Sequence, residues 1–121
     1  MKTNGFIDYN NIQITKQTKE ECIAEVSINE NSLNPFNIVH GGLIFTLGDT
    51  VTGFHANLLN GNSLTLDATI DFLKPGSGTK LIAKSKLIKS GTSTCILFAY
   101  IYNDKEELIA IMKTTYFYIK K

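Results

Sequence analysis

The chain has 121 residues, the length of one domain, and we expect a single domain over residues 1–121. Hydrophobic residues make up 43% and charged residues 19% of the sequence, which excludes a disordered chain and predicts a packed core. The net charge of +1 gives no sign of a nucleic-acid-binding surface. All twelve basic residues are lysine, so no guanidinium is available to clamp a phosphate or a carboxylate.

Two strands are predicted at the start of the chain, over Ile7–Gln17 and Cys22–Asn29, and in the second of them apolar and polar residues mostly alternate. Turn-forming residues crowd Glu30–Val39, which we interpret as a loop. A helix is predicted over Gly42–Leu59, and the Asn-Gly-Asn sequence at 60–62 supplies its stop signal. The first half of the chain therefore contains two strands, a loop and one long helix.

Four more strands are predicted after the helix, joined by short polar turns. They cover Ser63–Leu73, Lys80–Lys89, Thr94–Tyr102 and Leu108–Ile119. The first of them alternates cleanly, with one face made of Leu64, Leu66, Ala68, Ile70 and Phe72. One long helix with about six mostly antiparallel strands predicts an α+β fold in which the helix covers one face of the sheet.

The two cysteines, Cys22 and Cys95, lie far apart and have no histidine at zinc spacing, so we expect free buried thiols and no metal. No signal peptide is recognisable in Met1–Tyr9. The weakly polar run Ile38–Leu59 is long enough to span a bilayer, but Asp49 in its middle costs about 3 kcal/mol in a membrane. We therefore expect a cytoplasmic protein that does not insert into membranes.

Asp49 is the one formal charge in the predicted helix, so the helix is expected to be buried nearly all round. At 100° per residue, the arc against the sheet would hold Leu43, Ile44, Leu47, Val51, Phe54 and Leu58. Asp49 falls on another arc, among small and polar residues. This pattern favours a partly buried carboxylate that acts as a general base or nucleophile. The alternative is that this face of the helix is exposed to solvent and that Asp49 only adds solubility. His55 lies on the far side and is expected at the core edge or the surface.

Two glycines, Gly41 and Gly42, lie at the N-terminus of the predicted helix. They let a ligand approach the backbone closely and leave N–H donors free at the positive end of the helix dipole. This arrangement suits an oxyanion hole for a carbonyl oxygen that gains negative charge. The alternatives are that the glycines merely make a tight entry to the helix and that His40 caps backbone groups.

The whole constellation resembles the hotdog-fold acyl-CoA thioesterases of the phenylacetate-degradation type. The resemblance rests on Asn34, five residues, His40-Gly41-Gly42, six residues and Asp49, and on the strand at 65–75 that ends in Pro75. It covers essentially the full chain. It implies a hotdog thioesterase domain in which one long helix is wrapped by a five- or six-stranded, mostly antiparallel sheet.

The resemblance also implies roles for individual residues. The backbone N–H of Gly41 would polarise the thioester carbonyl, and Asn34 would position that carbonyl or the attacking water. Asp49 would activate water as a general base or attack as a nucleophile, with the Thr65 hydroxyl near the carboxylate. His40 would lie near the sulfur leaving group or orient the loop. In this family the carboxylate faces the Asn-His-Gly set of the other subunit, so we expect a homodimer that assembles to a homotetramer.

Two departures from the family pattern matter. Asn37 stands where the family usually has Gly, and Asn is the next best residue for a left-handed backbone. Arginines that often hold the phosphates of coenzyme A are absent, which leaves lysines such as Lys74, Lys80 and Lys89.

The resemblance implies hydrolysis of an acyl-CoA thioester to a carboxylic acid and free coenzyme A, which is part of the substrate and not a cofactor. A non-catalytic acyl-CoA-binding module and a hotdog dehydratase or hydratase are the alternatives. The sequence does not identify the acyl group of the substrate. Four aromatic residues could line its pocket or belong to the core, namely Phe36, Phe45, Phe54 and Phe72.

Overall fold

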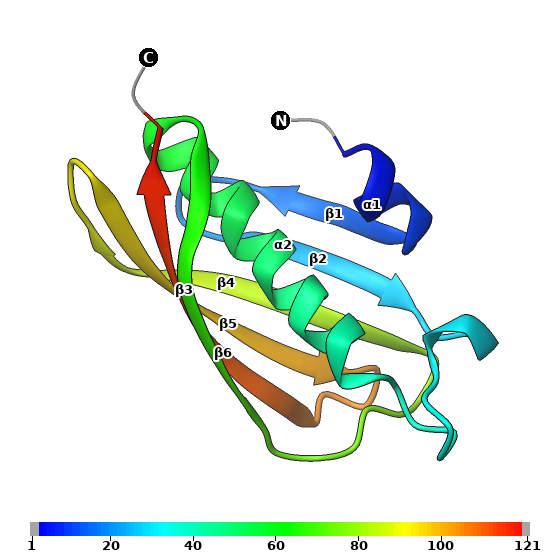
Figure 1. The fold of residues 1–121 in the computed structure, drawn as a ribbon. Coiled ribbons are helices and arrows are strands. Elements are labelled where there is room, and N and C mark those ends of the chain that lie inside the picture. The colour runs from blue at the N-terminus through cyan, green and yellow to red at the C-terminus, as the bar shows by residue number, and fades with distance from the viewer. Residues whose placement is uncertain (1–2, 120–121) are drawn as a thin grey trace.

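The computed structural model describes residues 3–119 and contains one six-stranded antiparallel sheet with a long helix, α2 (Gly41–Asn60), lying across it (Figure 1). The strand order is β1-β2-β4-β5-β6-β3. The strands are β1 (Ile12–Gln17), β2 (Cys22–Ser27), β3 (Ser63–Phe72), β4 (Lys80–Ser90), β5 (Thr94–Asn103) and β6 (Leu108–Tyr118). The predicted α+β architecture is confirmed, and the sheet curves around the helix, leaving β1 and β3 as its edges.

The core lies between α2 and the concave face of the sheet. Ile44, Leu47, Val51 and Phe54 of the predicted stripe are buried, and Leu43 and Leu58 pack against the core from its margin. Their spacing of three and four residues is what places them on one side of a helix. Along α2, Gly42 and Asn60 are exposed and the other residues are buried or half-buried. The helix is therefore largely enclosed, as its lack of charge predicts.

The predicted strand Ile7–Gln17 is wrong at its start. Residues 5–9 form a one-turn helix, α1 (Gly5–Tyr9), and β1 begins at Ile12. Asn10 ends that turn, because its side-chain N–H donates to the Phe6 carbonyl at 2.8 Å. Asn11 follows with φ of 60°, a left-handed conformation that asparagine tolerates better than most residues. The turn and its end at Asn10 and Asn11 delay the start of the strand to Ile12.

The first strand after the helix contains a β-bulge that the alternation did not predict. Across the β3–β6 ladder, Thr65 lies opposite Tyr116 and Asp67 lies opposite Thr115, so Leu66 has no partner. One extra residue reverses the direction of the side chains on either side of it.

The bulge changes which side chains share a face of β3. Thr65 points toward α2, and Ala68 and Ile70 also pack toward the core. Leu64 therefore points to the opposite side and is 60% exposed. The prediction that Leu64, Ala68 and Ile70 share one face of the strand is therefore wrong. As a consequence, the Thr65 hydroxyl lies beside α2 where the alternation would have placed the side chain of Leu64.

His55 is fully buried, not at the core edge or surface as expected. Its Nδ1 lies 2.8 Å from the Ser85 Oγ, and its Nε2 lies 2.7 Å from the Lys19 carbonyl oxygen. Because both ring nitrogens are hydrogen-bonded, the imidazole can replace an apolar side chain in the core. His55 thus joins α2 to β4 and to the β1–β2 turn.

The remaining predictions concern cysteines and membrane spans. Cys22 and Cys95 are free and buried, as expected, and burial raises the pKa of the Cys22 thiol to about 11. No helix within residues 3–119 combines the length and apolar character needed to cross a bilayer.

Candidate active site

The carboxylate of Asp49 is held by two hydroxyl groups. The Thr65 Oγ1 and the Tyr116 Oη each donate to the Asp49 Oδ1 at 2.8 Å. Asp49 itself is half-buried on α2. The structure therefore places Thr65 beside the carboxylate, where the family resemblance expects a hydroxyl, and it adds a phenol.

Tyr116 is the site residue that sequence reasoning missed. It is only 2% exposed, and its hydroxyl lies 2.9 Å from the Thr52 Oγ1 as well as beside the Asp49 carboxylate and backbone carbonyl. Burial, reinforced by the charge of Asp49, raises the pKa of Tyr116 far above its ordinary range. The phenol therefore keeps its proton and acts as a donor. The alternation of β6 would have put Tyr116 on the inward face, but no motif marks it.

Three elements together build this half of the site. Thr65 and Tyr116 are cross-strand neighbours on β3 and β6, and the bulge immediately after Thr65 turns its hydroxyl toward α2. Bulges commonly lie beside active sites because they redirect a side chain in this way.

The other predicted residues gather at the N-terminus of α2. His40 is the N-cap, and its Nδ1 accepts the Gly42 N–H at 2.8 Å. The capping alternative for His40 is thus what the structure shows. As the first helical residue, Gly41 keeps its N–H outside the ladder of helical hydrogen bonds. A Cβ on Gly41 would lie 3.3 Å from the Phe72 Cζ, so the glycine lets the Phe72 ring at the end of β3 pack closely on the start of the helix.

The loop before the helix is organised by Asn34. Its Oδ1 accepts the backbone N–H of Phe36 at 2.8 Å and that of Ile38 at 3.4 Å. Asn37 has φ of 63°, so the predicted left-handed conformation is confirmed. Because the loop occupies Oδ1, the Nδ2 of Asn34 is the group left to face a ligand.

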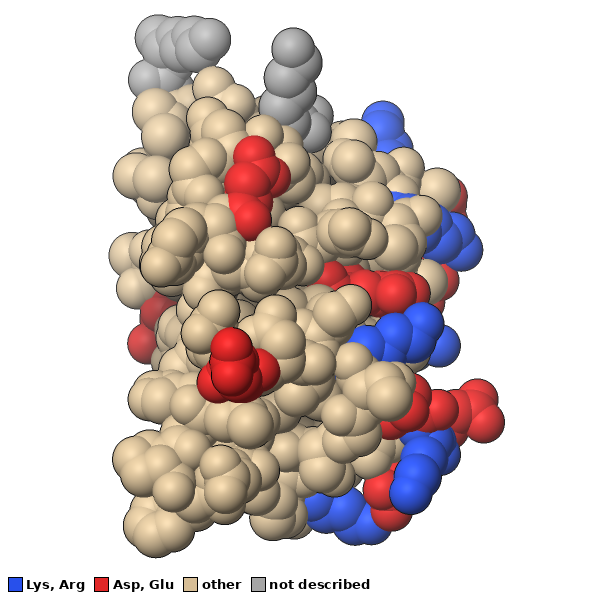
Figure 2. All heavy atoms as spheres, turned by 90° about the vertical axis from the view of Figure 1, so that its right-hand side faces the viewer, with Lys and Arg blue, Asp and Glu red and all other residues tan. Residues whose placement is uncertain are grey.

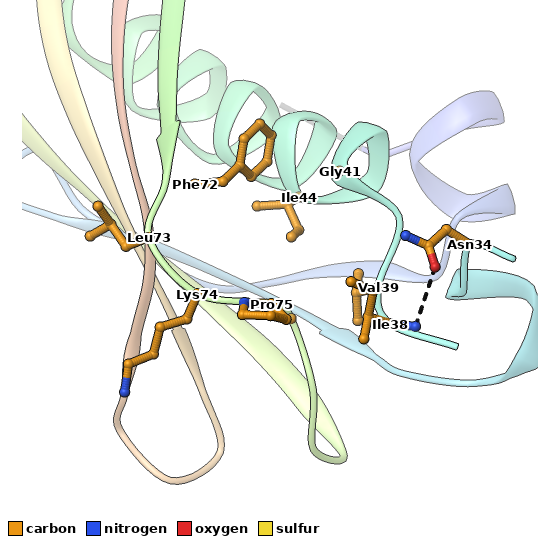
Figure 3. A pocket seen from close by; sticks show the side chains of 10 residues that line it. Asn34, Ile38, Val39, Gly41, Ile44, Phe72, Leu73, Lys74 and Pro75 are labelled. Atoms are coloured by element: carbon orange, nitrogen blue, oxygen red, sulfur yellow. Dashed lines mark hydrogen bonds between the residues drawn. The ribbon is translucent and has the colours of Figure 1, made fainter. Parts of the chain in front are cut away.

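Asn34 and Gly41 lie on one cavity of about 300 Å³ (Figure 3). The rest of its wall is mostly apolar and includes Ile38, Val39, Ile44, Phe72, Leu73 and Pro75. Of the four phenylalanines considered above, Phe72 lines this cavity, whereas Phe36 is 83% exposed and Phe54 is in the core. Phe45 packs against the core.

The lysines considered for phosphate contacts are at the surface. Lys74 also lines the cavity, and its Nζ lies 3.1 Å from a Glu107 carboxylate oxygen. Lys80 pairs with Glu25 at 3.3 Å, and Lys89 is exposed. Within residues 3–119, no three His, Cys, Asp or Glu side chains are grouped so that they could hold a metal ion.

A single chain does not bring the two sets of residues together. Asp49 lies eight residues after Gly41 on α2, which corresponds to about 12 Å along the helix axis. The carboxylate with Thr65 and Tyr116 forms one half-site, and Gly41 with Asn34 and the cavity forms another. One small substrate group cannot contact both halves of the same chain.

Known proteins resemble this chain in sequence. The family model of the thioesterase superfamily matches residues 36–110. The acyl-coenzyme A thioesterase PaaI of Escherichia coli is 26% identical over 103 residues, which cover 84% of this chain and 74% of that protein. A relative from Archaeoglobus fulgidus is 29% identical over 98 residues, and the match spans 64% of its length.

Solved structures share the fold over nearly the whole chain. The Escherichia coli PaaI structure has a TM-score of 0.89 at 23% identity and covers 94% of this chain and 83% of its own. A Streptococcus mutans protein solved with acetyl CoA has a TM-score of 0.87 at 25% identity and covers 93% and 92%. The predicted hotdog fold is confirmed, and because the family model matches more than half of the sequence, the chain belongs to the thioesterase superfamily.

Proposed function

We propose that this protein hydrolyses acyl-CoA thioesters to a carboxylic acid and free coenzyme A. The observation that carries the proposal is the Asp49 carboxylate, which two hydroxyls hold through Oδ1 while Oδ2 remains available to a substrate or water. A carboxylate held in this way is suited to take a proton or to attack a carbonyl. PaaI of Escherichia coli is named an acyl-coenzyme A thioesterase, which supports this substrate class.

The proposed reaction needs an oxyanion hole and a base. In the general-base route, Asp49 takes a proton from water, whose oxygen attacks the thioester carbon. The Gly41 N–H and the Asn34 Nδ2 stabilise the negative charge on the carbonyl oxygen. The C–S bond then breaks, and the proton passes to the departing sulfur, with His40 next to Gly41 at that end of the site. In the nucleophilic route, an Asp49 oxygen attacks the thioester carbon and the C–S bond breaks, which leaves a mixed anhydride and the thiolate of coenzyme A. Water then hydrolyses the anhydride to the carboxylic acid and the Asp49 carboxylate, and its second proton passes to the thiolate.

The site requires two copies of the chain in this proposal. Because one chain separates Asp49 from Gly41, we place the carboxylate of one copy against the helix N-terminus of the other. The edge strand β3 supports this arrangement, since it leaves one row of backbone groups unpaired and exposes Leu64 and Leu66 by 60% and 63%. Assembly of such dimers into a homotetramer remains part of the proposal.

The apolar cavity beside Gly41 is the proposed place for the acyl chain. Its polar groups, Asn34 and Gly41, lie where a carbonyl would enter, and apolar side chains line the remainder (Figure 3). A hydrocarbon or aryl group gains by leaving water in such a cavity.

A thiol-release screen across acyl-CoAs of different chain lengths and aryl groups tests the proposal. Asp49→Asn keeps the shape of the side chain but removes the base, and it should lower kcat at least about 100-fold. Asp8→Asn, which changes an exposed aspartate on α1, should leave the rate unchanged.

Two results would contradict the proposed hydrolysis. Full activity in Asp49→Asn would remove the carboxylate from the reaction. Calorimetric binding of acyl-CoA without thiol release from any member of the panel would favour a binding module. A change in enoyl absorbance without thiol release would instead indicate a hydratase or dehydratase.

A further inference from the structure

We propose that Tyr116 is a positioning residue for Asp49, whose phenol fixes the carboxylate so that Oδ2 faces the reacting water or carbonyl. This inference rests on the proposed function and extends it to a residue that the family motif does not contain. Tyr116 lies 67 positions from Asp49 in the sequence and donates to its Oδ1 at 2.8 Å.

The contact geometry restrains the aspartate at more than one point. The Tyr116 hydroxyl lies within hydrogen-bond distance of both the Asp49 Oδ1 and the Asp49 backbone carbonyl oxygen. Thr65 donates to the same Oδ1 from the neighbouring strand. Because both hydroxyls converge on one carboxylate oxygen, rotation of the carboxylate would break both bonds, and Oδ2 stays directed away from them.

The direction of the protons follows from the donor and acceptor capacities of these groups. An ionised carboxylate and a carbonyl oxygen only accept, so the single phenol proton of Tyr116 points toward Asp49, where the Oδ1 and the backbone carbonyl oxygen are both within reach. The remaining partner of the phenol oxygen is the Thr52 hydroxyl, 2.9 Å away, whose own proton also has the Gly48 carbonyl oxygen as an acceptor at 2.9 Å. Thr52, Tyr116 and Asp49 thus form a connected chain of hydrogen bonds. Thr52 and Tyr116 are buried, and low local polarity strengthens such a chain.

The packing of α2 on β6 leaves space for this phenol. A Cβ on Gly53 would lie 3.3 Å from the Tyr116 Oη and 3.5 Å from its Cε1, so the ring rests directly on the glycine. The ring is therefore held by the helix surface as well as by its hydrogen bonds. A fixed phenol can hold a carboxylate in one orientation, which is what a positioned base requires.

Tyr116→Phe removes the hydroxyl and keeps the ring. The variant leaves no buried hydroxyl without a hydrogen-bond partner, because the Thr52 hydroxyl can donate to the Gly48 carbonyl oxygen at 2.9 Å. Tyr118→Phe is the matched control. Tyr118 is also buried on β6, and its hydroxyl donates to the Ala56 carbonyl of α2 at 3.2 Å, so the control removes a tyrosine–helix bond far from the carboxylate.

We expect Tyr116→Phe to lower kcat about tenfold or more, with KM for an acyl-CoA changed less than about twofold. Tyr118→Phe should change neither kcat nor KM. A role of Tyr116 in stability alone would not lower the kcat of the folded variant while KM stays in place.

The outcomes distinguish this inference from the function on which it rests. If wild-type protein releases thiol, Asp49→Asn does not, and Tyr116→Phe matches wild type in kcat and KM, then Tyr116 has no positioning role. If wild type and Asp49→Asn behave alike, the proposed function itself fails. If Tyr116→Phe does not fold, Thr52→Val decides the question, since loss of the hydroxyl bonded to the phenol should lower kcat in the same direction by a smaller factor, and an unchanged rate would overturn the inference.

Discussion

The proposed chemistry of Asp49 depends on hydroxyl donors and not on a neighbouring cation. Within residues 3–119, the carboxylate is held by Thr65 and Tyr116. A lysine or arginine in contact would lower the proton affinity of the carboxylate strongly by direct charge attraction. Hydroxyl donors orient it without placing a positive charge beside it. A general base must both keep its direction and accept a proton, and this pair of neighbours serves both requirements.

His40 provides a test of what the motif histidine does. Its Nδ1 accepts the Gly42 N–H, so the neutral ring carries its proton on Nε2. His40→Ala should lower the free energy of unfolding by about 1 kcal/mol, because the first turn of α2 loses its cap. His40→Asn keeps a side-chain acceptor and should retain most of the stability and of kcat. Urea denaturation and thiol release measure the two effects separately.

A stable but inactive His40→Asn variant would contradict a purely capping role. It would show that the imidazole itself takes part in the departure of the sulfur, which is the other role considered for this residue. The alanine variant cannot separate these roles, because a frayed helix N-terminus also displaces the Gly41 N–H.

At the scale of single residues, the sequence predicts the site only where its members are close in the chain. Asn34, His40, Gly41 and Asp49 fall in one short motif, and the family resemblance adds Thr65. Tyr116 could not be predicted, since its contact with Asp49 depends on the register between β3 and β6. A sequence motif records spacing along the chain, whereas this contact arises from strand pairing.

At the scale of elements, periodic patterns predict the long helix and the last three strands to within one residue at each end. The two errors have local causes. Asparagine side chains end the one-turn helix α1 before β1 can begin. The bulge at Leu66 has no signal in an alternating strand, because it is stabilised by what its neighbours contact and not by its own residue type.

Gly48 tests how closely the helix approaches the sheet. Replacement of glycine by alanine inside a helix contributes up to about 1 kcal/mol of helix propensity. A Cβ on Gly48, however, would lie 2.5 Å from the Met112 Sδ and 3.2 Å from the Ile101 Cδ1, in the fully buried core. Gly48→Ala should therefore destabilise the protein by about 1–3 kcal/mol through overpacking.

Gly53→Ala is the comparison for that experiment. It gains the same propensity, but its nearest contact is 3.3 Å, so its free energy of unfolding should lie clearly above that of Gly48→Ala. Chemical denaturation of the two variants measures the difference. Equal stability of the two would show that the helix can move off the sheet without loss.

At the scale of the whole molecule, the distribution of charge separates two faces. In Figure 2 the side that carries α2 in Figure 1 lies at the left and is mostly uncharged, whereas the lysines gather toward the opposite side. The side that carries α2 includes Asp49, the one charged residue of that helix. A second copy placed there would meet few charges that require removal from water. This distribution favours the proposed dimer, which would join the half-sites of two chains.

Lysines on the edge of β3 should prevent that dimer. Leu64→Lys combined with Leu66→Lys places charges on the edge, a device that natural sheets use against edge pairing. Light scattering should then give the mass of a monomer, and thiol release should be lost in the same variant. Ile88→Lys changes a residue of similar exposure, 52%, on β4 and should leave both mass and activity intact.

Mixed dimers show directly whether the two halves of one site come from different chains. Gly41→Pro removes the N–H of the proposed oxyanion hole, and proline is well accepted at the first position of a helix. Its ring meets the side chain of Phe72, which is 52% exposed and has room to move. Asp49→Asn removes the carboxylate. Each variant alone should be inactive, but co-expression should give about a quarter of wild-type activity, since half of the dimers are mixed and each of these has one intact site of two. If both variants form dimers and the mixture stays inactive, Asp49 and Gly41 do not act together across the interface. Recovery is expected because the rigid helix keeps the two groups of one chain about 12 Å apart, so only a second chain can bring them to one thioester.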